Sequence, residues 1–194
     1  MKSIMGKVLF FGNGLNLLSQ NLSWKTLLSN VQAKDEVGLV GHDGLNLVDV
    51  PYPLQYDYIL LSSDFRKKVQ DVKDSTGWKK VIEDRQMNLK KAIIDEMKDF
   101  KSNLIYDQLS NLPFDAYLTT NYDHVLDESL TAMGFQSVVG DKSEMNYNIR
   151  RKRCLQKDSI LKTIYPVHGD VDSPRSIVIG YNHYCGTVER LATI

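Results

Sequence analysis

Three short segments of the sequence gather residues that could hold a small polar ligand and act on it. They are Phe11-Gly12-Asn13-Gly14-Leu15-Asn16, Thr119-Thr120-Asn121-Tyr122-Asp123 and Pro166-Val167-His168-Gly169-Asp170. Each follows an apolar run of the kind found in a buried strand. Ligands of open parallel sheets bind outside the carboxyl ends of the strands. The three segments are therefore the candidate site.

The first segment predicts a binding site for a pyrophosphate. Gly12 and Gly14 allow a sharp turn and a close approach of the ligand to the backbone. The helix that we expect next offers unpaired N–H groups to a phosphate. A strand-to-helix turn needs such glycines for structural reasons too, and the third glycine of the dinucleotide fingerprint is missing. Both interpretations stay open for this segment alone.

The second segment places a hydroxyl, an amide and a carboxylate at one strand end, on Thr120, Asn121 and Asp123. These donors and acceptors suit a ribose and a carboxamide. Alternatively, Thr120 or Asn121 caps a helix that begins near Tyr122.

The third segment carries a histidine that could exchange a proton near neutral pH. His168 follows an apolar strand and precedes a glycine, so its imidazole could project into the crevice. A lone histidine is also common in a purely structural role. His42, His124 and His183 have no comparable setting, and we assign them no function.

The elements that position these segments follow from the apolar pattern. Two strand-turn-helix units are expected, with strands at 4–11 and 115–119 and helices at 15–28 and 125–133. Further strands are expected at 135–139, 160–167 and 176–179, a loop at 34–56, and a helical insertion at about 57–111 that is broken near 75–77. The sequence predicts an α/β fold: a Rossmann-like parallel sheet flanked by helices, with the insertion between the two units.

Composition excludes several classes of partner. The 24 basic residues balance the 24 acidic ones, so no overall field favours nucleic acid or an anionic membrane, and we expect the basic run 150–153 to be a solvated face. Cys154 and Cys185 form neither a disulfide framework nor a four-ligand zinc site, which favours a reducing cytoplasm and predicts no metal. The apolar run Val8–Phe11 is too short for a membrane span.

Taken in this order, the three segments resemble the Sir2-like (sirtuin-related) NAD⁺-consuming domains, and above all the divergent bacterial branch found in anti-phage defence proteins. The matching stretches are Gly12 to Asn16, Thr120 to Asp123, His168-Gly169, and the strand end Ile177 to Tyr181. Together they cover most of the chain. The resemblance implies a Rossmann-like domain with NAD⁺ as its substrate and no metal.

The resemblance also implies a role for each residue. Gly12, Asn13, Gly14 and Asn16 would line the pyrophosphate and the adjacent ribose, and Thr120 would contribute to NAD⁺ binding. Asn121 would contact the nicotinamide ribose and position the attacking water, and Asp123 would recognise the carboxamide. His168 would be the base. Loss of nicotinamide develops positive charge on the ribose ring, so orientation and a positioned water matter more than a strong acid.

Three functions are compatible with this resemblance. The leading hypothesis is an NAD⁺ glycohydrolase that depletes NAD⁺ as a defence effector. A sirtuin-type protein deacylase is the first alternative, although two cysteines cannot supply the four-cysteine zinc module of deacetylating sirtuins. The second is a non-catalytic NAD⁺ or ADP-ribose sensor, which would have no need of both Asn121 and His168.

The last stretch of the sequence predicts an incomplete adenosine site. Sir2-like domains carry a Gly-Thr-Ser-type turn after the segment that Ile177 to Tyr181 resembles, and no such turn occurs here. Residues 181–194 are too few for a further strand-helix-strand unit, which takes roughly 30 residues. We therefore expect residues 1–194 to be one Sir2-like domain that lacks its C-terminal part and associates as a homo-oligomer or with further domains of a longer chain.

Overall fold

The computed structural model describes residues 6–20, 22–34, 50–61, 63–72, 75–141, 151–181 and 183–185. The chain forms two compact units. The first, here called the sheet unit, comprises Met1–Leu22 and Asp99–Ile177, and the second, the helical unit, comprises Ser23–Lys98 and Val178–Ile194.

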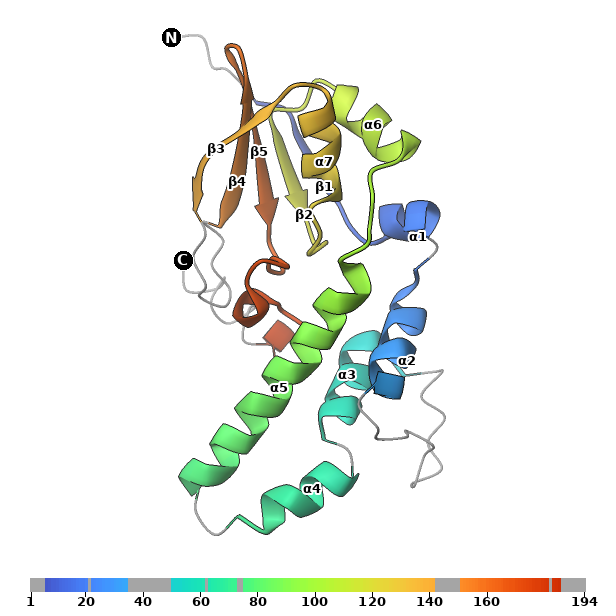
Figure 1. Ribbon diagram of the computed structural model, residues 1–194, viewed down its shortest axis with the longest axis vertical. Helices are drawn as coiled ribbons and strands as arrows, with labels where there is room; N and C mark the ends of the chain where they lie inside the picture. Colours follow the sequence, from blue (N-terminus) through green and yellow to red (C-terminus); the bar gives the residue numbers. More distant parts are fainter. Residues whose placement is uncertain are drawn as a thin grey trace. The chain divides into compact units, whose positions relative to one another are not determined.

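The sheet unit is built on five strands: β1 (Val8–Phe11), β2 (Ala116–Thr119), β3 (Gln136–Asp141), β4 (Lys152–Lys157) and β5 (Ile160–Pro166). Their order in the sheet is β1-β2-β5-β4-β3 (Figure 1). Strands β1, β2 and β5 are parallel, whereas β4 pairs antiparallel with both β5 and β3. The fold is mixed α/β with a partly parallel sheet.

The expectation of a wholly parallel sheet is wrong on the β3 side. Strands β4 and β5 are joined by a two-residue turn between Lys157 and Ile160, in which Asp158 takes a positive φ of 52°. So short a connection can join only antiparallel strands. We did not predict β4, because its polar sequence Lys152–Lys157 lacks the apolar alternation of a strand.

The strand expected at 176–179 is also wrong. Residues Pro174–Ser176 form a short 3-10 helix, and Ile177, Val178 and Ile179 follow without regular structure. All three apolar side chains are buried all the same. A short buried apolar run has the same sequence pattern whether or not it forms a strand, which explains the wrong prediction.

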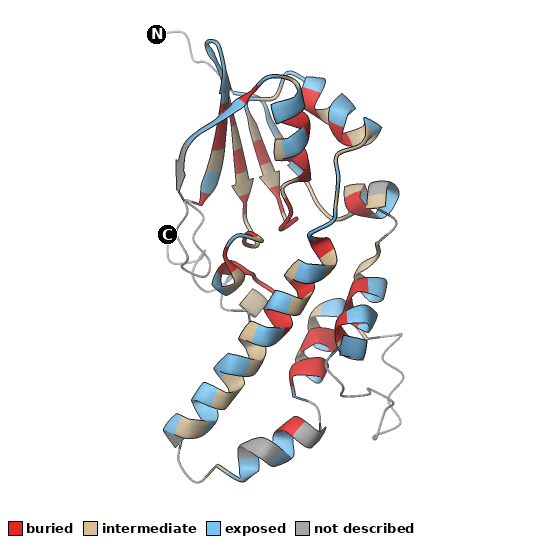
Figure 2. Cartoon of the chain, viewed as in Figure 1, coloured by how far each residue is buried: buried red, intermediate tan, exposed pale blue. Residues whose placement is uncertain are grey.

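Helices α1 (Gly14–Gln20), α6 (Leu104–Asn111) and α7 (Val125–Ala132) belong to the sheet unit. Side chains alternate between the two faces of a strand, and burial alternates along β2 and β5 (Figure 2). The paired residues Leu9, Tyr117 and Ile164 share the face that α6 and α7 cover. The core there consists of Tyr106, Tyr117, Val125, Leu126, Leu130, Phe135, Leu155 and Ile164.

The boundaries of α6 and α7 follow from local chemistry. The Asn103 side chain caps α6 by accepting from the Ile105 N–H at 2.9 Å. Helix α7 ends just before Gly134, whose φ of 91° suits glycine, as the sequence predicts.

The helical unit contains α2 (Trp24–Lys34), α3 (Tyr52–Leu60), α4 (Ser63–Gln70) and α5 (Ser75–Met97). Helix α5 contacts the other three and buries Leu89, Ile93 and Met97, four residues apart along one face. No helix in the described part of the chain is long and apolar enough to span a membrane.

Two expectations for this region need correction. The helix expected over 15–28 is divided into α1 and α2, because the Ser23 hydroxyl accepts from the Thr26 N–H at 3.0 Å and starts a new helix. Part of the loop expected over 34–56 is helical, since α3 begins at Tyr52 directly after Pro51. Residues 35–49 lie outside the described part.

Candidate functional site

The three segments singled out from the sequence leave the sheet side by side. The last residues of the parallel strands are in register, with Phe11 opposite Thr119 and Thr119 opposite Pro166. Beyond the strands, the Val171 N–H donates to the Tyr122 carbonyl at 3.0 Å, which joins the second and third segments. The structure therefore brings all three segments to one edge of the sheet, all within the sheet unit.

In the first segment, the glycine turn lies against the end of β2. A Cβ on Gly12 would lie 2.7 Å from the Thr120 Oγ1, so a larger residue would force the Thr120 side chain to move. Around a Cβ on Gly14, no atom of the described residues would lie within 4 Å. Gly12 is therefore packed against Thr120, whereas Gly14 faces open space where a ligand could approach the backbone.

Beside this turn, four buried side chains form one hydrogen-bonded network. Asn16 Nδ2 donates to Asp123 Oδ2 at 2.6 Å, and the Tyr106 hydroxyl donates to Asn16 Oδ1 at 2.5 Å. Asn121 Nδ2 donates to the Tyr106 oxygen at 3.2 Å. Asn16, Asn121 and Asp123 are among the predicted site residues, and the structure places them in direct or one-step contact.

Tyr106 was missed by the sequence reasoning. It lies in α6, inside the segment expected to be an insertion, and its side chain is fully buried. A buried tyrosine hydroxyl usually finds a polar partner, but the sequence does not show which one. Burial, aided by the nearby Asp123 charge, raises the pKa of Tyr106 far above its usual range, so the hydroxyl keeps its proton.

Asn121 has one polar atom with no partner. Its side chain is only 5% exposed, and no donor among the described residues reaches its Oδ1. A buried carbonyl without a donor is unfavourable in a protein interior and marks a place where a hydroxyl group or a water would be bound.

The alternative that Thr120 or Asn121 of the second segment caps a helix is wrong. Helix α7 begins at Val125 with His124 as its N-cap, and Asp123 Oδ1 accepts from the Val125 N–H at 3.1 Å. Neither Thr120 nor Asn121 caps the helix. Burial raises the pKa of Asp123, and the hydrogen bonds from the Asn16 amide and the Val125 N–H oppose that rise.

In the third segment, His168 occupies a tight turn. The following Gly169 has a φ of 112°, and a Cβ there would lie 2.5 Å from the Ser176 carbonyl oxygen, so the turn requires glycine. Burial lowers the pKa of His168 below its usual value. The neutral imidazole that results at pH 7 can accept a proton.

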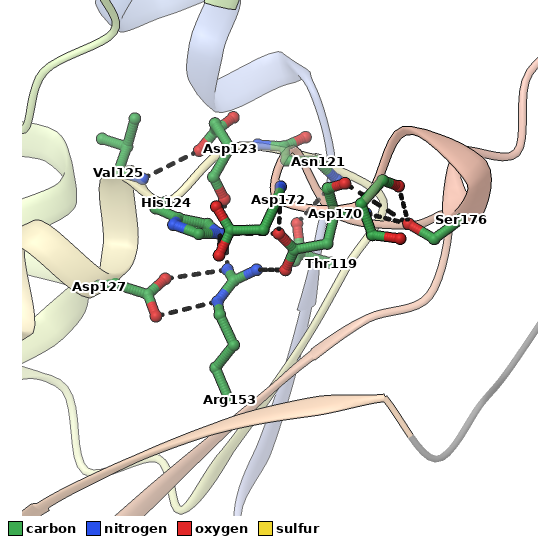
Figure 3. A network of polar contacts seen from close by, with 11 residues as sticks. Thr119, Asn121, Asp123, His124, Val125, Asp127, Arg153, Asp170, Asp172 and Ser176 are labelled. Carbon is green, nitrogen blue, oxygen red and sulfur yellow. Dashed lines mark hydrogen bonds and ion pairs between the residues drawn. The ribbon is translucent and has the colours of Figure 1, made fainter. Parts of the chain in front are cut away.

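A charged cluster of His124, Asp127, Arg153 and Asp170 braces the second and third segments (Figure 3). Arg153 Nε donates to Asp127 Oδ1 at 2.9 Å, and Arg153 Nη1 forms an ion pair with Asp170 Oδ2. Arg153 Nη2 donates to the Asp123 carbonyl at 3.2 Å, and His124 Nε2 lies 2.8 Å from Asp170 Oδ1. Arg153 on β4 thus connects α7 with both loops.

Two sequence expectations fail in this cluster. The basic run 150–153 is not a solvated face throughout, since Arg151 is buried and Arg153 makes these ion pairs, although Lys152 is exposed. His124, which we gave no role, binds Asp170. Burial opposes charge on His124, but the Asp170 hydrogen bond and charge outweigh it and raise the His124 pKa.

The electrostatics of Asp170 argue against a metal ion here. Within the described part of the chain, His124, Asp170 and Asp172 could offer ligand atoms that lie within 4.8 Å of one another. The Arg153 guanidinium, however, already occupies Asp170 and would repel a cation. The absence of a metal stays a prediction.

Comparison with known proteins adds independent evidence. Residues 115–192 match the family model of the SIR2-like domain. Over 177 residues, or 91% of the chain, the sequence is 27% identical to NAD(+) hydrolase ThsA of Cytobacillus dafuensis, covering 29% of that protein. It is 24% identical over 177 residues to NAD(+) hydrolase ThsA of Enterococcus faecium, covering 30% of it. The chain spans under a third of the length of these relatives.

Proposed function

This chain contains a SIR2-like domain with distant homology to NAD⁺ hydrolases, and from that premise we propose that it hydrolyses NAD⁺ to nicotinamide and ADP-ribose. The observation that carries the proposal is the buried Asn121 Oδ1, which has no donor within the described residues and lies at the meeting point of the three strand ends. An acceptor in that state suits a water or a ribose hydroxyl.

The proposed reaction requires the residues only to position a water and to accept one proton. The bond between the ribose C1′ and the nicotinamide nitrogen breaks, and its electron pair leaves with neutral nicotinamide. A water oxygen then bonds to C1′, and one proton is released. Asn121 orients the water or the adjacent ribose hydroxyl, and neutral His168 takes the proton.

The remaining predicted residues would bind the rest of NAD⁺. The open side of Gly14 suits the approach of the pyrophosphate, with Asn13 and Gly12 in the same turn. Asp123 and Thr120 would face the carboxamide. Both Asp123 oxygens already accept protein hydrogen bonds, and each has a second lone pair for a ligand amide.

The test is to incubate the protein with NAD⁺ and measure free nicotinamide and ADP-ribose. Asn121→Ala and His168→Ala should each abolish turnover while thermal melting shows a folded chain. Asn111→Ala, an exposed asparagine on α6, is the matched control and should keep full turnover. Full activity in either site variant would refute the assigned mechanism.

The same assay separates the alternatives. A deacylase would release nicotinamide only in the presence of an acylated peptide, and a sensor would bind NAD⁺ without releasing nicotinamide. The effector role predicts that expression of the active chain lowers cellular NAD⁺ and stops growth. The Asn121→Ala chain should do neither.

A further inference from the structure

We propose that Tyr106 is a positioning residue, which sets the orientation of the Asn121 side-chain amide through a hydrogen-bond relay that ends on Asp123. This inference rests on the proposed function only in taking Asn121 as the residue that orients the reacting water. The relay runs Asn121, Tyr106, Asn16, Asp123, and every member is buried.

The direction of the relay is visible at its Asp123 end. Both oxygens of Asp123 accept hydrogen bonds, Oδ2 from the Asn16 amide and Oδ1 from the Val125 N–H. The NH₂ group of Asn16 therefore faces Asp123. The Asn16 Oδ1 is then left pointing at Tyr106.

Tyr106 passes this constraint on to Asn121. A tyrosine hydroxyl has a single proton, and that proton is donated to Asn16 Oδ1. The Tyr106 oxygen can then only accept, so Asn121 must present its NH₂ group, as the 3.2 Å contact from Nδ2 shows. The Asn121 Oδ1 is thereby directed away from the relay, and no donor in the described ranges reaches it.

Packing alone does not explain the Tyr106 hydroxyl. The ring lies in the apolar core of the sheet unit, where phenylalanine would fill nearly the same volume without burying a polar group. The Tyr106 hydroxyl forms hydrogen bonds with Asn16 and Asn121, both predicted site residues. Tyr117 in the same core is a contrast, because its hydroxyl binds Lys162 Nζ at 3.1 Å.

The matched pair of variants is Tyr106→Phe and Tyr117→Phe. Each removes one buried hydroxyl from the same core, but only the first cuts the relay. The first readout is the side-chain amide signal of Asn121 in the ¹⁵N-labelled chain, assigned through Asn121→Asp. In the wild type, one amide proton of Asn121 should exchange slowly with solvent. That protection should be lost in Tyr106→Phe and kept in Tyr117→Phe.

The second readout is kinetic. In Tyr106→Phe, kcat for nicotinamide release should fall about tenfold or more, because a misoriented catalytic group is costly, while KM stays within about twofold. Tyr117→Phe should retain the wild-type kcat. A purely structural role would instead lower the melting temperature of both variants and leave the kcat of the folded fraction unchanged.

The outcomes are distinct from those for the proposed function. If the wild type releases no nicotinamide, the proposed function fails, and the amide exchange alone still decides on the relay. Fast exchange of both Asn121 amide protons in the wild type would overturn the relay and needs no variant. Protection of the Asn121 amide that is retained in Tyr106→Phe, or protection that is lost while kcat is unchanged, would overturn it too.

Discussion

Replacing Arg153 by methionine removes a side chain that connects β4 with α7 and with both loops of the site. Methionine keeps much of the length and apolar volume of arginine but removes the guanidinium. Asp127 and Asp170 then lose the cation to which they are bound, with Arg153 Nη2 and Asp127 Oδ2 2.9 Å apart in the intact protein. His124 remains as the second partner of Asp170.

The expected loss of stability can be estimated from the burial of the cluster. Removing one partner of a buried ion pair costs about 3–5 kcal/mol. The side chains of Arg153, Asp127 and Asp170 are 16%, 18% and 7% exposed, so solvent screens the cluster slightly and the lower limit applies. We expect the free energy of unfolding to fall by about 3 kcal/mol. For a chain of this length, that lowers the melting temperature by roughly 6–12 °C.

The assay is urea unfolding at pH 7 and at pH 3.5, with Lys152→Met as the matched control. Lys152 is the exposed neighbour of Arg153 on β4, and its replacement changes the charge equally. It should alter stability by less than about 0.5 kcal/mol. The hydrogen bond with His124 and the charge of Arg153 outweigh burial and hold the pKa of Asp170 well below its usual value. The stability gained from that ionised carboxylate is present in full above its unfolded pKa of about 3.9 and is lost as pH falls through its much lower folded pKa. At pH 3.5 only the first part of it is lost, so the difference between Arg153→Met and wild type should shrink there by less than about 1 kcal/mol.

A loss of less than about 1 kcal/mol in Arg153→Met, similar to that in Lys152→Met, would refute this reasoning. It would show that the ion pairs of Arg153 do not stabilise the fold, despite their burial.

Three further predictions concern the same edge of the sheet. Gly169→Ala should lower both the melting temperature and the rate of nicotinamide release, because the added Cβ would lie 2.5 Å from a backbone oxygen. Gly14→Ala should leave the melting temperature unchanged, because its added Cβ meets no atom of the described residues. Equal melting temperatures of the two variants would contradict this. The raised pKa of His124 contributes stability that is present below the unfolded value of about 6.5 and is lost as pH rises through the folded pKa. Denaturant titrations should therefore show wild-type stability falling from pH 6 to pH 9 and a flatter profile in His124→Gln; parallel profiles would exclude the linkage. Chelators should leave the melting temperature unchanged, and stoichiometric zinc or another metal in elemental analysis would overturn the prediction of no metal.

The sequence alone determined where the strand ends of the candidate site lie along the chain. Apolar runs that end in Gly12, Thr120 and Val167 are local signals of strand ends, and the structure confirms a strand before each of them. The residue types in those segments suit a ribose and a carboxamide. The resemblance of the three segments to Sir2-like domains then implied NAD⁺ as the ligand. Both strand-turn-helix units were predictable from the same local signals, although the first helix was predicted too long.

Only the tertiary structure decided which side chains work together. Tyr106 binds Asn16 from 90 residues away and His124 binds Asp170 from 46 residues away, and neither pairing leaves a periodic trace in the sequence. The same holds for Arg153. Its basic neighbours in the sequence indicated a solvated face, but the pairing of β4 with β5 places its side chain beside Asp127 and Asp170. Local pattern is set by contacts within a few residues, whereas a polar network is closed by strand register and helix packing, which bring distant residues within hydrogen-bonding distance.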